Sequence, residues 1–205
     1  MIWNDEGFLI SKNNLDENSI VVEAFTLNYG KYSGIVFGGS SRKQKKILQI
    51  GNKMIFNLKS KNDNKIGYFN SELIKPVSPM FFDDKKRTIC IYAASNLLKI
   101  LLPERQSNKI IYYSFDKFIN DMVYDNWIRS YIFWELSLIK ELGFETNFSK
   151  MDTPEIILNH NTNNYTKLDI SKALVFNRNL LLENFINPNH LKLPSSRNIL
   201  EKYFT

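Results

Sequence analysis

The amino-acid sequence predicts an α+β protein in which a small β-barrel is followed by an all-helical domain. Before Pro76 and Pro79, apolar residues occur in short alternating runs, as in strands, and after Pro79 their spacing becomes helical. The 205 residues are 43% hydrophobic and 14% aromatic, which is enough for packed cores. We therefore expect a barrel domain over residues 1–78 and a helical domain over residues 79–205.

Five short strands are expected in the first domain. Alternating or clustered apolar residues cover residues 7–11, 19–26, 32–37, 53–59 and 66–74. Turn-forming residues at 28–31 and 61–64 join neighbouring strands as hairpins. A five-stranded barrel is the OB-fold arrangement, in which one face and its loops commonly bind oligonucleotides. An SH3-like barrel is the alternative.

The second domain is expected to be helical. One helical face is formed by Ile89, Ala93, Leu97, Ile100 and Leu101. Leu102-Pro103 ends that segment. Residues 125–142 are apolar nearly all round, which predicts a central buried helix with Gly143 just beyond its end. Helical spacing resumes at 169–185 and after Pro194, whereas residues 145–167 are predicted to be a loop or an irregular region.

Positive charge is concentrated in one stretch. The chain has a net charge of +6 and a pI of about 9.2, which favours polyanionic partners. Residues 31–65 hold nine basic residues and one acid, Asp63, well above the average density of basic residues. A Lys-rich composition would explain the net charge but not its concentration. Nucleic-acid binding is therefore the leading hypothesis.

The run from Gly38 to Lys46 combines two glycines, two hydroxyls and four cations directly after a predicted strand. As a loop it would let backbone and cations approach phosphates, although it lacks the Gly-Lys-Ser/Thr ending of a nucleotide P-loop. A solvated Lys-rich loop is the alternative. The candidate nucleic-acid contacts are Lys31, Tyr32, Arg42, Lys43, Lys45, Lys46, Lys53 and Lys59. Tyr29, Tyr32, Phe37 and Phe56 are candidates for base stacking, although core packing is favoured for each.

No residue pattern predicts catalysis, a cofactor or a metal. His160 and His190 lack the spacing of metal ligands, and the single Cys90 excludes a multi-cysteine zinc site and reads as a core residue. Residues 83–84 are better explained as helix caps than as Mg²⁺ ligands. Glu135, if buried, should pair with a basic side chain. We expect a protein that is not an enzyme.

No apolar stretch reaches the roughly 18 residues needed to span a bilayer. The first residues, Met1 to Glu6, lack the basic and apolar regions of a secretory signal. A cytoplasmic protein without membrane partners is therefore expected.

Short motifs in this chain resemble the bacterial recombination mediator RecO. In the N-terminal part they are residues 16–20, Phe25-Thr26, Gly30-Lys31, residues 38–42 and Leu48-Gln49. Downstream they are residues 101–105, 134–136, 142–144 and 193–197, which resemble the helical region and C-terminal end of the alphaproteobacterial version. Their shared order and spacing over almost the whole chain carry the resemblance.

The resemblance implies a DNA repair protein that binds single- and double-stranded DNA and anneals complementary strands. It also implies that the protein works with RecR to help RecA replace the single-stranded-DNA-binding protein on DNA. The helical domain would bind the acidic, Phe-ending tail of that single-stranded-DNA-binding protein. No nucleotide would be hydrolysed. A monomer that associates with the nucleoid during repair is expected.

Two departures from that family stand out. Relatives often have Arg immediately before the aromatic-Glu-Leu motif, where this chain has Phe133, and Arg129 one turn earlier is a candidate substitute. Many relatives carry four zinc-binding cysteines after the Leu-Gly-Phe segment, whereas here Met151 stands near the first position. An RNA-binding OB-fold protein and an adaptor that binds only proteins remain alternative hypotheses.

Overall fold

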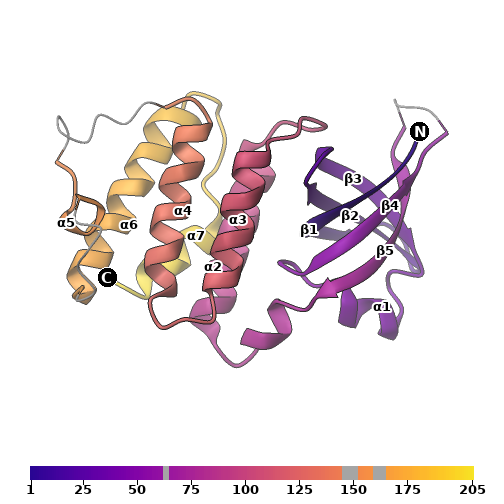
Figure 1. The fold of residues 1–205 in the computed structure, drawn as a ribbon, viewed down its shortest axis with the longest axis horizontal. Coiled ribbons are helices and arrows are strands. Elements are labelled where there is room, and N and C mark those ends of the chain that lie inside the picture. Colours follow the sequence, from indigo (N-terminus) through magenta and orange to yellow (C-terminus); the bar gives the residue numbers. More distant parts are fainter. Residues whose placement is uncertain (62–64, 145–151, 159–164) are drawn as a thin grey trace. The chain divides into compact units, whose positions relative to one another are not determined.

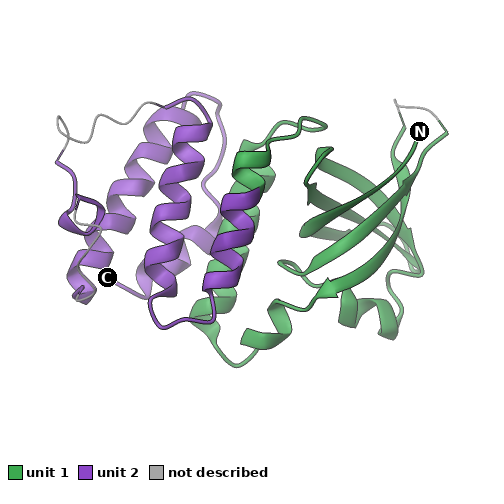
Figure 2. Cartoon of the chain, viewed as in Figure 1, with its two compact units in different colours: residues 1–112 green, residues 113–205 purple. Residues whose placement is uncertain are grey.

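The computed structural model describes residues 1–61, 65–144, 152–158 and 165–205. Two compact units, Met1–Tyr112 and Tyr113–Thr205, divide the chain (Figure 2). The predicted boundary after residue 78 falls inside the first unit, because helix α2 (Lys85–Leu101) packs against strand β1 (Ile2–Asn14). The division into domains over residues 1–78 and 79–205 stays a prediction.

The first unit contains a closed five-stranded barrel with the strand order β1–β2–β3–β5–β4 (Figure 1). After β1, its strands are β2 (Ser19–Thr26), β3 (Gly30–Phe37), β4 (Lys53–Lys59) and β5 (Gly67–Lys75). Neighbouring strands are antiparallel except β3 and β5, which pair in parallel at Gly34↔Gly67 and Ile35↔Tyr68. The predicted OB-fold barrel is confirmed, and each predicted strand is present. The predicted turn at 61–64 lies largely outside the described residues.

Side-chain alternation fills the barrel with apolar groups. Leu9, Val22, Val36, Leu58 and other inward residues are buried in one cluster. Two of the four aromatics considered for stacking belong to this core, with Tyr32 5% exposed and Phe56 fully buried. Trp3 contacts the Tyr32 ring edge-on, with centroids 5.2 Å apart. These two rings are therefore used for packing.

Residues 42–46, predicted to be a loop, instead lie in a short helix, α1 (Arg42–Ile47). The Ser41 hydroxyl caps it by accepting a hydrogen bond from the Gln44 backbone N–H at 3.3 Å. Arg, Lys and Gln then favour the helix, whereas the neighbouring glycines had indicated a loop. Gly38 has a φ of +66°, in the left-handed region that glycine favours. The chain therefore turns at Gly38, between the end of β3 and the Ser41 cap of α1.

Helices follow the barrel, as predicted. They are α2, α3 (Lys109–Asp121), α4 (Trp127–Glu141), α5 (Glu155–Leu158), α6 (Lys167–Leu181) and α7 (Ser195–Lys202), with a 3-10 turn η1 (Ser78–Phe81) and a π-helical turn η3 (Leu182–Ile186). Asp84 caps α2 by accepting hydrogen bonds from the backbone N–H groups of Lys86 and Arg87, both at 3.0 Å. The cap prediction is thus confirmed for Asp84. Helix α3 was not identified from the sequence. Residues 145–151 and 159–164 of the predicted irregular region lie outside the described residues.

A buried ion pair organises the second unit. Arg197 of α7 donates hydrogen bonds to both carboxylate oxygens of Glu135 of α4, at 2.6 and 3.0 Å. Tyr131 donates a third bond to that carboxylate and Asn177 of α6 a fourth. Both charged side chains are fully buried, which confirms that Glu135 is paired with a basic residue.

Candidate nucleic-acid interface

Four cations lie exposed on α1: Arg42, Lys43, Lys45 and Lys46. The helix buries none of its residues and has no acid in its first turn. Among the residues that the structure describes, no carboxylate forms an ion pair with any of the four. Cations without protein partners are available to replace the counterions of a phosphate backbone.

Beside α1 is a cavity of about 420 Å³. The described residues that line it are Lys12, Asn13, Asn14, Ile20, Gly39, Lys45, Leu48 and Gln49, which provide two cations and three amides and no carboxylate. Gly39 packs closely on Ile20, since a Cβ there would lie 2.5 Å from Ile20 Cγ1. The cations and amide groups of this lining suit an anionic group such as a phosphate.

Lys12 is a functional candidate that the sequence did not reveal. Its Nζ donates a hydrogen bond to the backbone oxygen of Leu48 at 2.5 Å. Burial lowers the pKa of Lys12, and the positive charge of Lys45 lowers it further. An anion placed between these lysines would relieve their repulsion. Lys12 lies outside the basic stretch 31–65, so charge counting missed it.

Two predicted contacts, Lys31 and Tyr32, lie in the packing of the first unit. Lys31 is 8% exposed, and its Nζ donates to the backbone oxygen of Lys99 at 2.7 Å. Burial lowers the pKa of Lys31, partly opposed by the charges of Glu104 and Glu23. Both side chains are thus largely buried. Charge counting could not reveal this, because it takes no account of strand orientation.

The two predicted β4 contacts differ from each other. Lys53 is held 3.1 Å from the Glu6 carboxylate, and its Nζ lies over the Phe8 ring. Lys59 is exposed and lies opposite Tyr68 in the strand register. Lys59 is therefore the more accessible of the two.

One of the four aromatics considered for stacking is strongly exposed. Phe37 is 65% exposed and stacks on Tyr68, which is 45% exposed, with centroids 4.7 Å apart. Tyr29 is instead half-buried and stacks on Trp3. Tyr68 was not considered from the sequence, because it lies three residues beyond the basic stretch.

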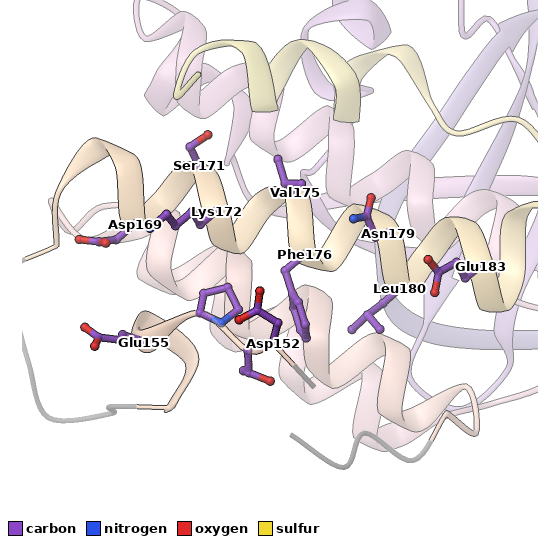
Figure 3. A pocket seen from close by; sticks show the side chains of 12 residues that line it. Asp152, Glu155, Asp169, Ser171, Lys172, Val175, Phe176, Asn179, Leu180 and Glu183 are labelled. Atoms are coloured by element: carbon purple, nitrogen blue, oxygen red, sulfur yellow. The ribbon is translucent and has the colours of Figure 1, made fainter. Parts of the chain in front are cut away.

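The second unit contains a larger cavity of about 940 Å³ (Figure 3). Among the described residues that line it, Asp152, Glu155, Asp169 and Glu183 are acidic and Lys172 is the one cation. Since carboxylates repel phosphates, this cavity does not suit nucleic acid.

A further cavity of the second unit, of about 480 Å³, is lined by both apolar and cationic side chains. Phe133 and Trp134 line it together with Lys117 and Arg129. The Arg129 guanidinium lies over the rings of Phe133 and Tyr165, at 5.3 and 5.1 Å from their centroids. Arg129 therefore lies beside Phe133, the residue found where the sequence comparison led us to expect an arginine.

Within the described residues, no helix combines the length and apolar character needed to cross a membrane. The same residues contain no cluster of three or more His, Cys, Asp or Glu side chains placed to hold a metal ion.

The strand order defines an OB-fold barrel, and a helical region follows it in the chain. Residues 1–77 match the family described as "Recombination protein O N terminal", and residues 83–151 match "Recombination protein O C terminal". The chain belongs to the RecO family.

Relatives named "DNA repair protein RecO" include those of Ehrlichia chaffeensis, at 33% identity over 152 residues, and Wolbachia sp. subsp. Drosophila simulans, at 31% over 152 residues. A Cereibacter sphaeroides relative with that name is 28% identical over 148 residues. The matches cover 73%, 73% and 72% of this chain and 62% of each relative. The matched region is thus less than two thirds of each relative's length.

Proposed function

We propose that this protein is a non-catalytic DNA repair and recombination mediator that binds DNA through α1 and the adjoining cavity. The observation that supports this proposal is the set of α1 cations beside a cavity whose described lining residues include two lysines and no carboxylate, in a chain of the RecO family. Five proposed contacts come from the predicted set: Arg42, Lys43, Lys45, Lys46 and Lys59. Lys12 is added to these, and Lys31, Tyr32 and Lys53 are left out on grounds of burial or pairing.

The proposed contacts are suited to phosphates rather than to base edges. Lys and Arg on an exposed helix neutralise backbone charge and release counterions, whatever the base sequence. Both single and double strands offer such phosphates, so this surface supports binding to either. Annealing of complementary strands follows if two strands are held with their charges screened. Cooperation with RecR and RecA remains part of the proposal.

The DNA-binding proposal is tested with a variant that replaces Arg42, Lys43, Lys45 and Lys46 with Ala. We expect weaker binding to labelled single strands and duplexes of several sequences, and a salt slope reduced by about one for each phosphate that is no longer neutralised. A control with equal charge loss replaces Lys140, Lys172, Lys192 and Lys202, which are exposed in the second unit. Equal effects of the two variants, or unchanged affinity of the α1 variant, would exclude α1 as the interface.

The RNA-binding alternative is tested on the wild-type chain. DNA and RNA oligonucleotides of equal sequence compete at fixed salt, and preference for DNA is expected. A strong preference for RNA would support the alternative. Failure to bind any labelled oligonucleotide at low salt would instead support a protein-binding adaptor.

We further propose that the 480 Å³ cavity of the second unit receives the acidic, Phe-ending tail of the single-stranded-DNA-binding protein. The aromatic lining suits a terminal ring, and Arg129 and Lys117 suit carboxylates. Asp121 also lines the cavity, and its ion pair with Lys117 at 2.8 Å offsets part of that charge. Arg129 is therefore the main proposed anchor.

The tail proposal is tested with a fluorescent acidic peptide ending in Phe. Anisotropy should show binding that Arg129→Ala weakens about tenfold or more, since a charge-assisted hydrogen bond contributes about 1.5–3 kcal/mol. The control is Lys140→Ala, which removes one positive charge from an exposed position outside the cavity lining. Equal binding of a peptide lacking its final Phe would contradict the proposal.

A further inference from the structure

The Phe37 and Tyr68 rings form an exposed aromatic pair on the outside of the barrel. Their centroids are 4.7 Å apart, and their planes differ by 20°. They lie where β3 and β5 pair in parallel, since Tyr68 faces Ile35 and Phe37 follows two residues later. We propose that this pair, the aromatic platform, stacks on unpaired bases and thereby makes the barrel favour single-stranded over duplex DNA. The inference rests on the proposed DNA binding and adds a basis for strand preference.

The platform differs from the other aromatic contacts of the barrel in its exposure. Trp3, Tyr32, Phe56 and Phe69 contact one another in the core and are at most 5% exposed. Phe37 keeps 65% of its surface exposed and Tyr68 45%, although burial of such rings would be favourable. Mutual stacking alone explains a cross-strand contact, but it leaves much ring surface in water. That surface is available to a base.

Cations border the platform on the β4 side. Lys59 lies directly opposite Tyr68 in the register of β4 and β5. Lys59, Lys61 and Lys65 are all exposed, and the last two lie in the connection between these strands. Phosphates flanking a stacked base would thus meet positive charge on this side.

Along the chain, the platform also adjoins the cavity beside α1. Gly39, which lines that cavity, is two residues from Phe37, so their backbones are at most about 7 Å apart. A single strand could therefore place phosphates at Lys12 and Lys45 and a base near Phe37.

Acids border the platform elsewhere. Ser19 pairs with Phe37 in the register and follows the acidic turn residues Asp16 and Glu17, and Glu72 is exposed further along β5. Hydrogen bonds from the backbone N–H groups of Asn18 and Ser19 lower the pKa of Asp16, so it is charged at neutral pH. Repulsion from these carboxylates would direct the phosphates toward Lys59 and α1.

Base stacking separates the two forms of DNA because only an unpaired base has a free face. In a duplex each base is already stacked between its neighbours, and exposing one costs unstacking and unpairing. The α1 cations contact phosphates in both forms, whereas the platform adds affinity only for single strands.

The test compares Phe37→Leu/Tyr68→Leu with Tyr68→Phe, which keeps both rings. Binding to an oligothymidine strand and to a duplex of equal length is measured at one salt concentration. The Leu variant should lose about tenfold or more in affinity for the single strand and change about twofold or less for the duplex. Tyr68→Phe should leave both affinities within about twofold, since stacking needs the ring and not the hydroxyl.

A strand containing 2-aminopurine provides a direct measure of stacking. Its fluorescence should be quenched on binding to wild type and Tyr68→Phe, and less quenched with the Leu variant. Equal losses for strand and duplex, or no loss for the strand, would overturn the platform. If the wild-type protein bound neither oligonucleotide, the proposed DNA binding itself would be wrong. If the wild-type protein bound DNA, the α1 variant bound it more weakly and the double Leu variant bound it as well as wild type, only the platform would be refuted.

Discussion

Arg197 and Glu135 are 62 residues apart in the sequence, yet they form a two-point ion pair, with donor–acceptor distances of 2.6 and 3.0 Å. Burial disfavours the charge of Arg197, but Glu135, Tyr131 and Glu201 raise its pKa above the ordinary range. Arg197 also donates to the Leu174 backbone oxygen at 2.7 Å. The pair therefore connects α4, α6 and α7 through one guanidinium.

Replacing Arg197 with Met should destabilise the protein by about 3–5 kcal/mol, because the Glu135 charge would stay buried without its partner. Denaturant unfolding of the full chain provides the measurement. The double variant Glu135→Leu/Arg197→Met should recover part of that loss, since apolar replacement of both charges removes the unpaired group. A double variant as unstable as Arg197→Met would contradict this explanation.

Asp84 should contribute pH-dependent stability through the α2 cap. Partial burial opposes its ionisation, but hydrogen bonds and the charge of Arg87 hold the pKa of Asp84 below 3.8. Because the folded pKa is the lower one, this stabilisation is present above about pH 3.8 and is lost as pH falls through the folded value. Asp84→Asn should therefore lower the thermal midpoint at pH 7, with the difference from wild type shrinking below about pH 3.8. A difference independent of pH would contradict the role of the charge.

Lys31→Met should leave the salt dependence of DNA binding unchanged, because its Nζ is held by the Lys99 backbone oxygen inside the first unit. Lys45→Met, the same substitution on the exposed α1, should reduce the salt slope by about one. Equilibrium titrations at several salt concentrations compare the two. A reduced salt slope for Lys31→Met would show that Lys31 does contact DNA.

The pKa of Lys12 should depend on the charge of Lys45. Since Lys45 contributes to the lowered pKa of Lys12, Lys45→Met should raise the pKa of Lys12 toward 10.5. NMR titration of the Lys12 side chain measures the change, with Lys46→Met as the neighbouring control. A phosphate bound between the two lysines should also raise the Lys12 pKa in wild type. No upward shift in Lys45→Met would show that the pair is uncoupled.

Local sequence patterns were sufficient to predict the barrel strands. Alternation marks which residues of β2 and β4 point inward, and the change of apolar period after Pro79 marks the helices. Helix α1 was missed because Gly38 and Gly39 suggest a loop more strongly than Ser41 suggests a cap. The need for a partner at Glu135 was predictable, but its identity depends on packing between distant helices.

The candidate site was only partly predictable for the same reason. Charge density found the α1 cations, which are exposed on a local helix. It also selected Lys31, whose burial depends on contact between the barrel and α2. It missed Lys12 and Tyr68, which lie outside the basic stretch and are brought to the candidate surface by strand pairing.

The parallel pairing of β3 and β5 has a kinetic consequence. It comprises two residue pairs, whereas β1 and β2 are paired at seven, so the barrel should open first between β3 and β5. Amide hydrogens at Gly34 and Gly67 should then exchange with solvent sooner than those of the β1–β2 hairpin. Phe37 lies on β3 and Tyr68 on β5. A ligand stacked on both rings would therefore connect the two strands and slow their separation.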